Sequence, residues 1–294
     1  MVKIYLIANF RDNKQLNELY KRQTPGNKGI WEDIYLTDDK SKADFFIVLN
    51  EAREKIPDMK RTIFFAREPK YAPGHRTMRN IKEAYKVCNF NTCYMFARWN
   101  LNKSYDELVN MEPPKKEELV SCIVSGKRML SGQRRRLEFI LEFCNRYPKV
   151  LHLYGKVNKD KKFINHITGG IDKWAKDEGL AKFKFSFAFE NGRQENYFSE
   201  KFVDPILMWT VPVYWGCPNI GKFFPWHSYI HVNIFSKFHK LNDEVDQLYQ
   251  LLQLGGVNWE EKYIPVLRES RDLILNKYNF WPTLYKLLDT GKVL

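Results

Sequence analysis

The feature that most constrains the fold of this chain is a series of short, almost uninterrupted apolar runs. They are rich in β-branched and aromatic residues and cover 3–8, 44–49, 61–66, 119–125, 150–155, 183–189, 211–216 and 229–235. Near-continuous apolarity is typical of strands that are buried on both faces of a parallel sheet. Apolar residues recur at helical spacing over 134–146 and again after Asn242, a plausible N-cap. Strands that alternate with helices predict an α/β fold.

The length and one charged segment predict two domains. A chain of 294 residues exceeds the ~150 residues of a typical domain, and its 44% apolar content excludes intrinsic disorder. Pro113 and Pro114 lie in a charged stretch and continue neither a helix nor a central strand. We therefore expect an N-terminal domain over 1–116 and a C-terminal domain over 117–294, the latter ending in amphipathic helices from about Trp259.

No apolar run approaches the ~18 residues that a membrane span needs. Arg11 and Asp12 end the first apolar stretch too early for a signal peptide. The five cysteines form no CxxC pair, which favours a reducing compartment over a zinc ribbon. His227 and His231 are four residues apart but lack the glutamate of an HExxH motif. The expectation is a soluble, cytoplasmic chain without a metal site.

The charge of the chain favours an anionic partner. The formal net charge is +13 and the pI is about 9.3, which suits nucleic acid, an anionic surface or a phosphorylated small molecule. Five cations gather within 127–136, after the strand expected at 119–125 and at the start of the next helix. Free N–H groups at a helix N-terminus favour a diphosphate there. A solvated basic helix face explains the run equally well, and the run does not match the Walker A pattern.

A second candidate follows the strand over 183–189. This strand ends in Glu190-Asn191, a polar loop follows, and Ser199 can cap the next helix. Ligands in open α/β sheets gather at the carboxyl ends of strands. Glu200 could accept two ribose hydroxyls and Lys201 could reach a phosphate. The alternative is an ordinary capped helix with a surface ion pair, worth ~0–1 kcal/mol.

The third candidate is the turn that ends the strand over 211–216. Gly216 and Pro218 force a turn there. Tyr214 or Trp215, beside this turn, could line a pocket. Trp226 lies in an aromatic group at 223–226 that suits packing and, less often, a sugar platform.

The run over 185–232 resembles the donor-binding signature of glycosyltransferase family 10, the α-1,3/1,4-fucosyltransferases. That signature is a strand ending in FEN, a short loop, Y-[IV]-[TS]-E-K, a helix, VP-[VI]-x-x-G-x-P, and a strand opening with S-[FY]-[IV]. Here the corresponding segments are FSFAFEN, YFSEKF, VPVYWGCP and SYI in the same order. Upstream, Ser125, Gly132 and Arg136-Leu137-Glu138-Phe139 resemble the serine, loop and helix start of the family. Phe64-Phe65-Ala66-Arg67-Glu68-Pro69 resembles its N-terminal strand ending in a glutamate.

The resemblance implies a GT-B architecture of two Rossmann-like domains facing across a cleft. The first domain would bind the acceptor and the second domain the donor. It implies an enzyme that transfers L-fucose from GDP-fucose to a glycan hydroxyl with inversion, forming an α-1,3 or α-1,4 linkage. The missing membrane anchor resembles bacterial or viral members. No tightly bound cofactor is implied, and a divalent metal could stimulate the reaction without being required.

The resemblance also assigns roles to residues. Asn191, Tyr197, Glu200 and Lys201 match donor contacts, Arg136 matches the arginine on the diphosphate, and Glu68 matches the proposed general base. Ser125, Tyr214 and Gly216 are expected in the donor site. Cationic side chains can stabilise a leaving diphosphate, and a carboxylate on the opposite face can take the acceptor proton. The alternative for Glu68 is an ion pair with Arg67 or Arg61.

Three other functions remain open from the sequence. The donor could be another GDP-6-deoxyhexose, the run over 127–136 could bind nucleic acid, or the chain could be an inert scaffold. No motif identifies the acceptor or the oligomeric state, although no nucleic acid is expected as a partner if the resemblance holds.

Overall fold

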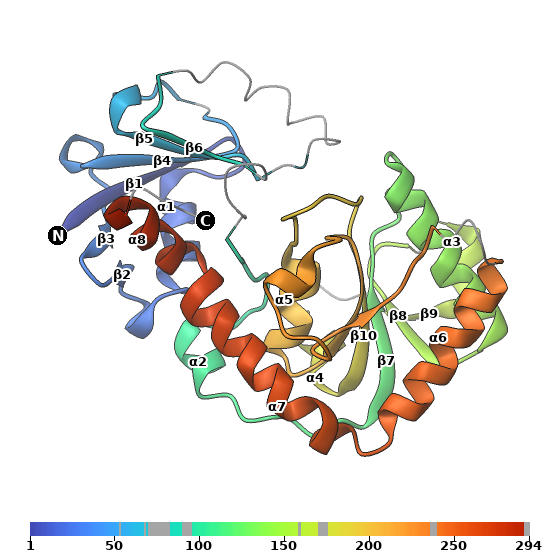
Figure 1. Cartoon of the computed structure of the whole chain (residues 1–294). Coiled ribbons are helices and arrows are strands. Elements are labelled where there is room, and N and C mark those ends of the chain that lie inside the picture. The colour runs from blue at the N-terminus through green and yellow to red at the C-terminus, as the bar shows by residue number, and fades with distance from the viewer. Residues whose placement is uncertain are drawn as a thin grey trace. The chain divides into compact units, whose positions relative to one another are not determined.

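The computed structural model describes residues 1–52, 54–67, 69, 83–89, 96–157, 160–169, 176–235 and 240–290. The chain divides into two compact units, which are described separately (Figure 1). The first unit comprises Met1–Ala97, Lys103–Met111 and Leu275–Leu294, and the second comprises Arg98–Asn102 and Glu112–Ile274. The division after Met111 lies a few residues before the boundary expected from the sequence.

The first unit is built on a six-stranded sheet in the order β2-β3-β1-β4-β5-β6. Its strands are β1 (Val2–Ala8), β2 (Ile30–Trp31), β3 (Ile34–Leu36), β4 (Phe45–Leu49), β5 (Thr62–Phe65) and β6 (Lys86–Cys88). All neighbours pair in parallel except β2, which is antiparallel to β3. Helices α1 (Asn13–Lys21), α2 (Tyr105–Val109) and α8 (Phe280–Thr290) and the short turns Pro25–Asn27, Lys40–Lys42 and Met59–Arg61 complete the described part of this unit.

The C-terminal helix α8 groups with the first unit. The Trp281 indole nitrogen donates to the carbonyl oxygen of Tyr20 at 3.0 Å, and the Phe280 ring lies 4.5 Å from the Tyr20 ring. The π-helical turn Leu273–Tyr278 precedes α8. The boundary expected from the sequence places this whole region in the C-terminal domain. The structure differs because helical periodicity predicts an apolar face but not the surface that this face covers.

The second unit contains six parallel strands in the order β12-β11-β10-β7-β8-β9. These are β7 (Glu118–Ile123), β8 (Leu151–Tyr154), β9 (Ile167–Gly169), β10 (Phe183–Phe189), β11 (Val211–Trp215) and β12 (Ile230–His231). Numbered in chain order, this arrangement is the 3-2-1-4-5-6 order of Rossmann folds. The α/β fold class predicted from the apolar runs is therefore confirmed, and the order of strands reverses between β7 and β10.

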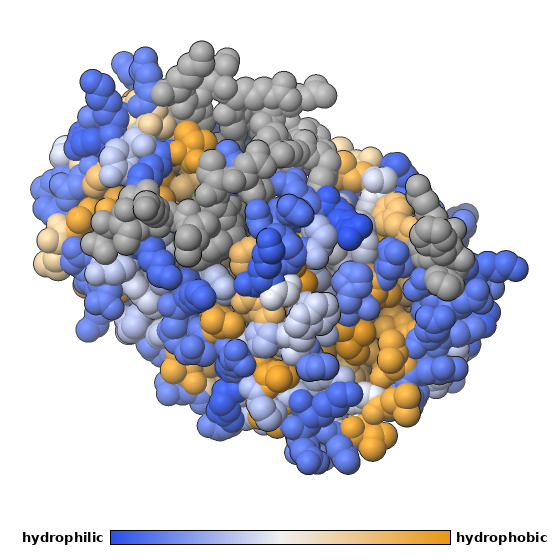
Figure 2. All heavy atoms as spheres, in the orientation of Figure 1, coloured by the Kyte–Doolittle hydropathy of each residue, from blue (hydrophilic) through white to orange (hydrophobic). Residues whose placement is uncertain are grey.

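The helices of the second unit are α3 (Ser131–Arg146), α4 (Glu178–Ala181), α5 (Glu200–Leu207), α6 (Leu241–Gly256) and α7 (Trp259–Asp272), with short turns at Lys161–His166 and Ile220–Lys222. Hydrophobic side chains come to the surface where α6 ends, at Leu254 and Val257 (Figure 2). None of the helices in the described part of the chain has both the length and the apolar content needed to cross a bilayer.

Packing against β10 places the start of α3 at the point where the strand order reverses. Phe139 and Phe143 of α3 lie edge-on to Phe187 of β10, with ring centroids 6.3 and 5.2 Å apart. Full burial of such a side chain contributes about 1.5–3 kcal/mol. A Cβ atom on Gly132 would lie 2.3 Å from the carbonyl oxygen of Asn191. The first turn of α3 is therefore in direct contact with the loop that follows β10.

Replacing Gly132 with alanine should move the start of α3 away from this loop. The added methyl group has no space beside the Asn191 carbonyl, and overpacking of this kind costs about 1–3 kcal/mol. We expect Gly132→Ala to lower the free energy of unfolding in urea by that amount. Gly169→Ala is the matched control, because no described atom other than those of its chain neighbours lies within 4 Å of the position that its new methyl group would occupy. Equal stability of the two variants would contradict this packing argument.

Candidate active site

A cavity of about 530 Å³ opens at the carboxyl ends of β7, β8 and β10, wholly within the second unit. Small-molecule sites typically measure 300–1,000 Å³, and the reversal of strand order is where open α/β sheets bind ligands. Its polar wall consists of Asn100, Ser125, Lys127, Arg136, Lys156, Lys176, Asn191, Glu200 and Lys201. Five of these side chains are cations and one is an acid. The cavity therefore suits an anionic ligand.

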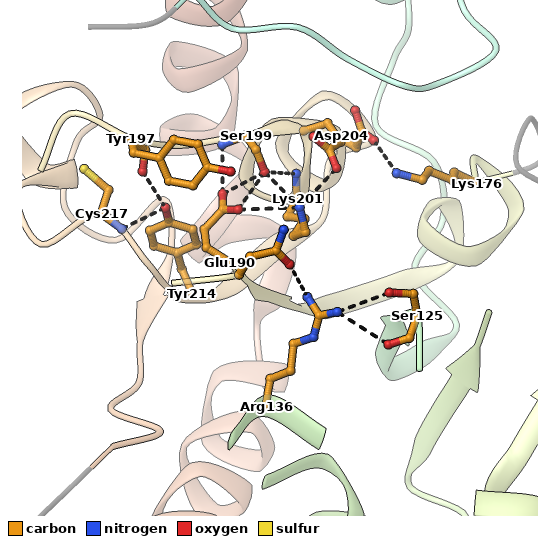
Figure 3. A network of polar contacts seen from close by, with 12 residues as sticks. Ser125, Arg136, Lys176, Glu190, Tyr197, Ser199, Lys201, Asp204, Tyr214 and Cys217 are labelled. Atoms are coloured by element: carbon orange, nitrogen blue, oxygen red, sulfur yellow. Dashed lines mark hydrogen bonds and ion pairs between the residues drawn. The ribbon is translucent and has the colours of Figure 1, made fainter. Parts of the chain in front are cut away.

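Arg136 joins the two strands at which the order reverses (Figure 3). Its Nη1 donates to Asn191 Oδ1 at 2.9 Å, and its Nη2 donates to the Ser125 hydroxyl at 3.2 Å and carbonyl oxygen at 3.4 Å. The residue is only 3% exposed. Burial lowers its pKa, but an arginine still stays charged in a protein. Its Nε is buried as well and has no hydrogen-bond partner among the described residues.

The two preceding arginines point elsewhere. Arg134 donates to the carbonyl oxygens of Arg128 and Met129. Arg135 donates to the carbonyl oxygen of Ile234 at 2.6 Å and pairs with Glu138 at 3.0 Å. The three consecutive arginines thus point in different directions, and only Arg136 among them lines the cavity.

Lys201 is held at the start of α5 by a buried carboxylate. Glu190 is fully buried and accepts hydrogen bonds from the Ser199 backbone N–H at 2.8 Å and hydroxyl at 2.7 Å. Lys201 Nζ lies 3.5 Å from Glu190 Oε2 and 3.2 Å from Glu200 Oε1. Burial acts to lower the pKa of Lys201, but these two carboxylates outweigh it and the pKa is raised. Lys201 is therefore a fixed ammonium group.

Glu190 supports the site, although the sequence motifs assign it no role. It lies where an apolar strand ends, and it fixes both the cap of α5 and Lys201. Burial raises its pKa, and the charge of Lys201 opposes that shift. The available signal was an acidic residue at the end of an otherwise apolar strand, where only an internal partner makes burial favourable.

Glu200 is the first residue of α5 and faces the cavity. Burial acts to raise its pKa, but the positive charges of Lys201, Lys176 and Arg98 hold the pKa well below its usual range. An ionised carboxylate accepts hydrogen bonds only. Glu200 is therefore suited to bind hydroxyl groups of a ligand.

Three residues expected in the donor site lie outside the cavity wall. Tyr214 is completely buried, and its hydroxyl accepts from the Cys217 N–H at 3.0 Å and donates to the Tyr197 carbonyl oxygen at 3.5 Å. Tyr197 is itself 8% exposed. A Cβ atom on Gly216 would lie 2.4 Å from Glu190 Cγ. Gly216 thus lies directly against Glu190 and the Tyr214 hydroxyl, and the place expected for Tyr197, Tyr214 and Gly216 in the donor site stays a prediction.

Glu68, the predicted general base, lies outside the described residues. Its neighbour Arg67 donates its backbone N–H to Asn50 Oδ1 at 2.7 Å, at the end of β5 in the first unit. The role of Glu68 stays a prediction. Over the parts of the chain that are described, no three His, Cys, Asp or Glu side chains gather closely enough to hold a metal ion.

Residues 113–271 match the family described as "Glycosyltransferase family 10 (fucosyltransferase) C-term". This stretch is more than half of the chain and includes every cavity-lining residue except Asn100. The chain belongs to glycosyltransferase family 10. The family resemblance predicted from the motifs is thereby confirmed, and the cavity of the second unit lies in the family's own domain.

Individual relatives match over shorter stretches. An α-(1,3)-fucosyltransferase of Helicobacter pylori is 35% identical over 82 residues, which cover 28% of this chain and 17% of that protein. GDP-fucose protein O-fucosyltransferase 3 of Gallus gallus is 35% identical over 109 residues, covering 33% of this chain and 22% of that protein. The matched stretches thus span only about a fifth of the length of these curated relatives.

Solved structures support the fold. A crystal structure of an α1,3-fucosyltransferase with GDP-fucose has a TM-score of 0.51 and 16% identity, covering 99% of this chain and 89% of that one. S. aureus TarM has a TM-score of 0.51 and 13% identity, covering 86% of this chain and 56% of that one. At such identities the likeness concerns the fold alone, which is that of GT-B glycosyltransferases.

One further titratable group lies beside the site. Asp204 of α5 is 2% exposed, and its Oδ1 accepts from the Asn100 backbone N–H at 2.9 Å. Its Oδ2 lies 3.3 Å from Lys176 Nζ. Burial raises the pKa of Asp204 to about 6, the charge of Lys176 opposes this, and Glu200 adds to it.

This shift predicts a pH dependence of stability. Because the pKa of Asp204 is higher in the folded chain than the ~3.9 of an unfolded one, the folded state binds the proton more tightly between about pH 4 and 6. The stabilising contribution is present below pH 4 and is lost as the pH rises through 6. As the pH rises from about 4 to 6, the free energy of unfolding of the unmodified chain should fall relative to that of Asp204→Asn. Urea titrations at several pH values measure it, and a constant difference between the two proteins would contradict the shift.

Proposed function

We propose that this chain is an inverting glycosyltransferase that transfers L-fucose from GDP-fucose to a hydroxyl of a glycan acceptor, forming an α-1,3 or α-1,4 linkage. The observation that carries the proposal is a buried Arg136 and a fixed Lys201 on one cavity, at the strand reversal of the family's domain. The similarity to an α-(1,3)-fucosyltransferase supports the sugar and the linkage, and the similarity to GDP-fucose protein O-fucosyltransferase 3 supports GDP-fucose as the donor. In this proposal the second unit binds the donor and the first unit binds the acceptor.

The cations act on the leaving group. As the bond between sugar and phosphate breaks, positive charge develops on the sugar ring and negative charge on the departing GDP. Arg136 is already held by Asn191 and Ser125, so it need not reorganise during the reaction. Each ionic hydrogen bond from Arg136 or Lys201 to the diphosphate contributes about 1.5–3 kcal/mol. Glu200 accepts hydrogen bonds from the ribose hydroxyls.

Inversion requires a base on the face opposite the leaving group. We assign this role to Glu68, on the basis of its place in the family motif. The acceptor oxygen bonds to the anomeric carbon while the bond to the diphosphate breaks, and the acceptor proton passes to the Glu68 carboxylate. The cations of the cavity serve the leaving group without a metal ion, so a divalent metal would stimulate the reaction at most.

Substitution of Arg136 or Lys201 should slow transfer strongly, whereas substitution of a neighbouring arginine should have little effect. We expect Arg136→Met and Lys201→Met each to lower kcat/KM by about 100-fold or more, because a preorganised partner of the developing charge is lost. Arg134→Met is the matched control, since Arg134 donates to carbonyl oxygens of the segment that precedes α3 and does not line the cavity. The assay measures GDP release from GDP-fucose with N-acetyllactosamine-type and simple galactoside acceptors.

Further arms of the same assay test the other assignments. Glu68→Ala should lower kcat by about 10²–10⁴ while GDP-fucose binding is unchanged. Competition among GDP-sugars distinguishes fucose from another GDP-6-deoxyhexose. Absence of both turnover and GDP-fucose binding in the unmodified chain would overturn the proposed function. Tight, salt-dependent binding of nucleic acid instead would support the alternative role of residues 127–136.

A further inference from the structure

The cavity contains a third cation that is partly withdrawn from water. Lys176 precedes α4 and reaches the cavity wall from a different segment than Arg136 and Lys201. Its side chain is 20% exposed, whereas Lys127 and Lys156, the remaining cations of the wall, are exposed to solvent. Charges in water are screened strongly and partly buried ones much less. Lys176 therefore contributes more to the field inside the cavity than Lys127 or Lys156 does.

A buried carboxylate fixes the position of Lys176. Figure 3 shows Lys176 extending toward Asp204, and the two groups are 3.3 Å apart. The other oxygen of Asp204 holds the backbone of Asn100, which also lines the cavity. The ion pair of Lys176 and Asp204 adds little to the net free energy of folding compared with apolar side chains of the same size. An ammonium group has three donors, so Lys176 can keep its bond to Asp204 and still donate to a ligand.

The charge of the cavity wall suits a diphosphate. The wall holds five cations and Glu200, and Glu190 and Asp204 lie directly behind it. Arg136, Lys176 and Lys201 are less exposed than Lys127 and Lys156. Loss of Lys176 would therefore remove one of the three cations whose charge is screened least.

We propose that Lys176 binds the diphosphate of the donor and that Asp204 positions it. This inference rests on the proposed function, and it adds a donor-binding residue and a positioning residue to the site. Neither residue was singled out by the sequence motifs, because Lys176 lies on another segment and Asp204 lies one turn beyond Glu200 on α5.

The first test measures equilibrium binding by calorimetry for two ligands, GDP-fucose and guanosine. Lys176→Met should weaken GDP-fucose binding by about 10- to 100-fold, the loss of one ionic hydrogen bond. Guanosine binding should be unchanged because it carries no diphosphate, whereas a general disturbance of the cavity would weaken both ligands. Lys176→Arg keeps the charge and should restore most of the affinity. Lys182→Met, a lysine of the same region outside the cavity wall, is the control.

The second test asks whether Asp204 acts through Lys176. Asp204→Asn should weaken GDP-fucose binding in the unmodified chain and have no further effect in Lys176→Met. Equal effects in both backgrounds would overturn the positioning role. Thermal unfolding of each variant shows that the folded protein is being compared.

The outcomes separate this inference from the proposed function. If the unmodified chain binds GDP-fucose and Lys176→Met binds it with an affinity within twofold of that value, only this inference is overturned. Failure of the unmodified chain to bind GDP-fucose overturns the proposed function and this inference with it. Equal weakening of guanosine and GDP-fucose by Lys176→Met also overturns the role of Lys176 at the diphosphate.

Discussion

The buried guanidinium of Arg136 is the interaction on which the site depends. It bonds the residues that follow β7 and β10, Ser125 and Asn191, and so joins the two strands between which the sheet reverses its order. This bond requires the first turn of α3 to lie against the loop after β10, which only a residue without a side chain permits at position 132. Once that contact forms, one cation is fixed in the wall of the cavity, and its buried Nε has no partner among the described residues.

A second buried charge organises the part of the cavity wall that the start of α5 contributes. Desolvation of the Glu190 carboxylate is unfavourable, and its bonds to Ser199 and its ion pair with Lys201 offset this cost. The same contacts cap α5 and direct Lys201 and Glu200 to the cavity. Tyr214 and Gly216 support this arrangement from behind, since a larger residue than Gly216 would displace Glu190. The two parts of the cavity wall thus each depend on one buried charged residue, Arg136 in one part and Glu190 in the other.

Much of this arrangement follows from local pattern. The apolar runs predicted β1, β4, β5, β7, β8, β10, β11 and β12, and they missed only the short strands β2, β3, β6 and β9 within the described parts of the fold. Of the site residues predicted, Ser125, Arg136, Asn191, Glu200 and Lys201 line one cavity. Tyr197, Tyr214 and Gly216 are not among its lining residues, because a tyrosine fits a buried position as well as a pocket wall and Gly216 faces Glu190. Motifs also missed Glu190, Lys176 and Asp204, whose importance comes from partners elsewhere in the chain.

The sequence alone determined the fold class and the family, because strand and helix periodicity and ordered motifs are local properties of the chain. The family motif singled out Arg136 among three consecutive arginines, and the tertiary structure supplies the physical reason. Arg136 turns inward because its partner Asn191 lies 55 residues away in sequence but beside it across the strand reversal. The contacts of Phe280 and Trp281 with Tyr20, in contrast, decided that the last helix joins the first unit. These contacts join segments that are distant in sequence, and no local pattern contains them.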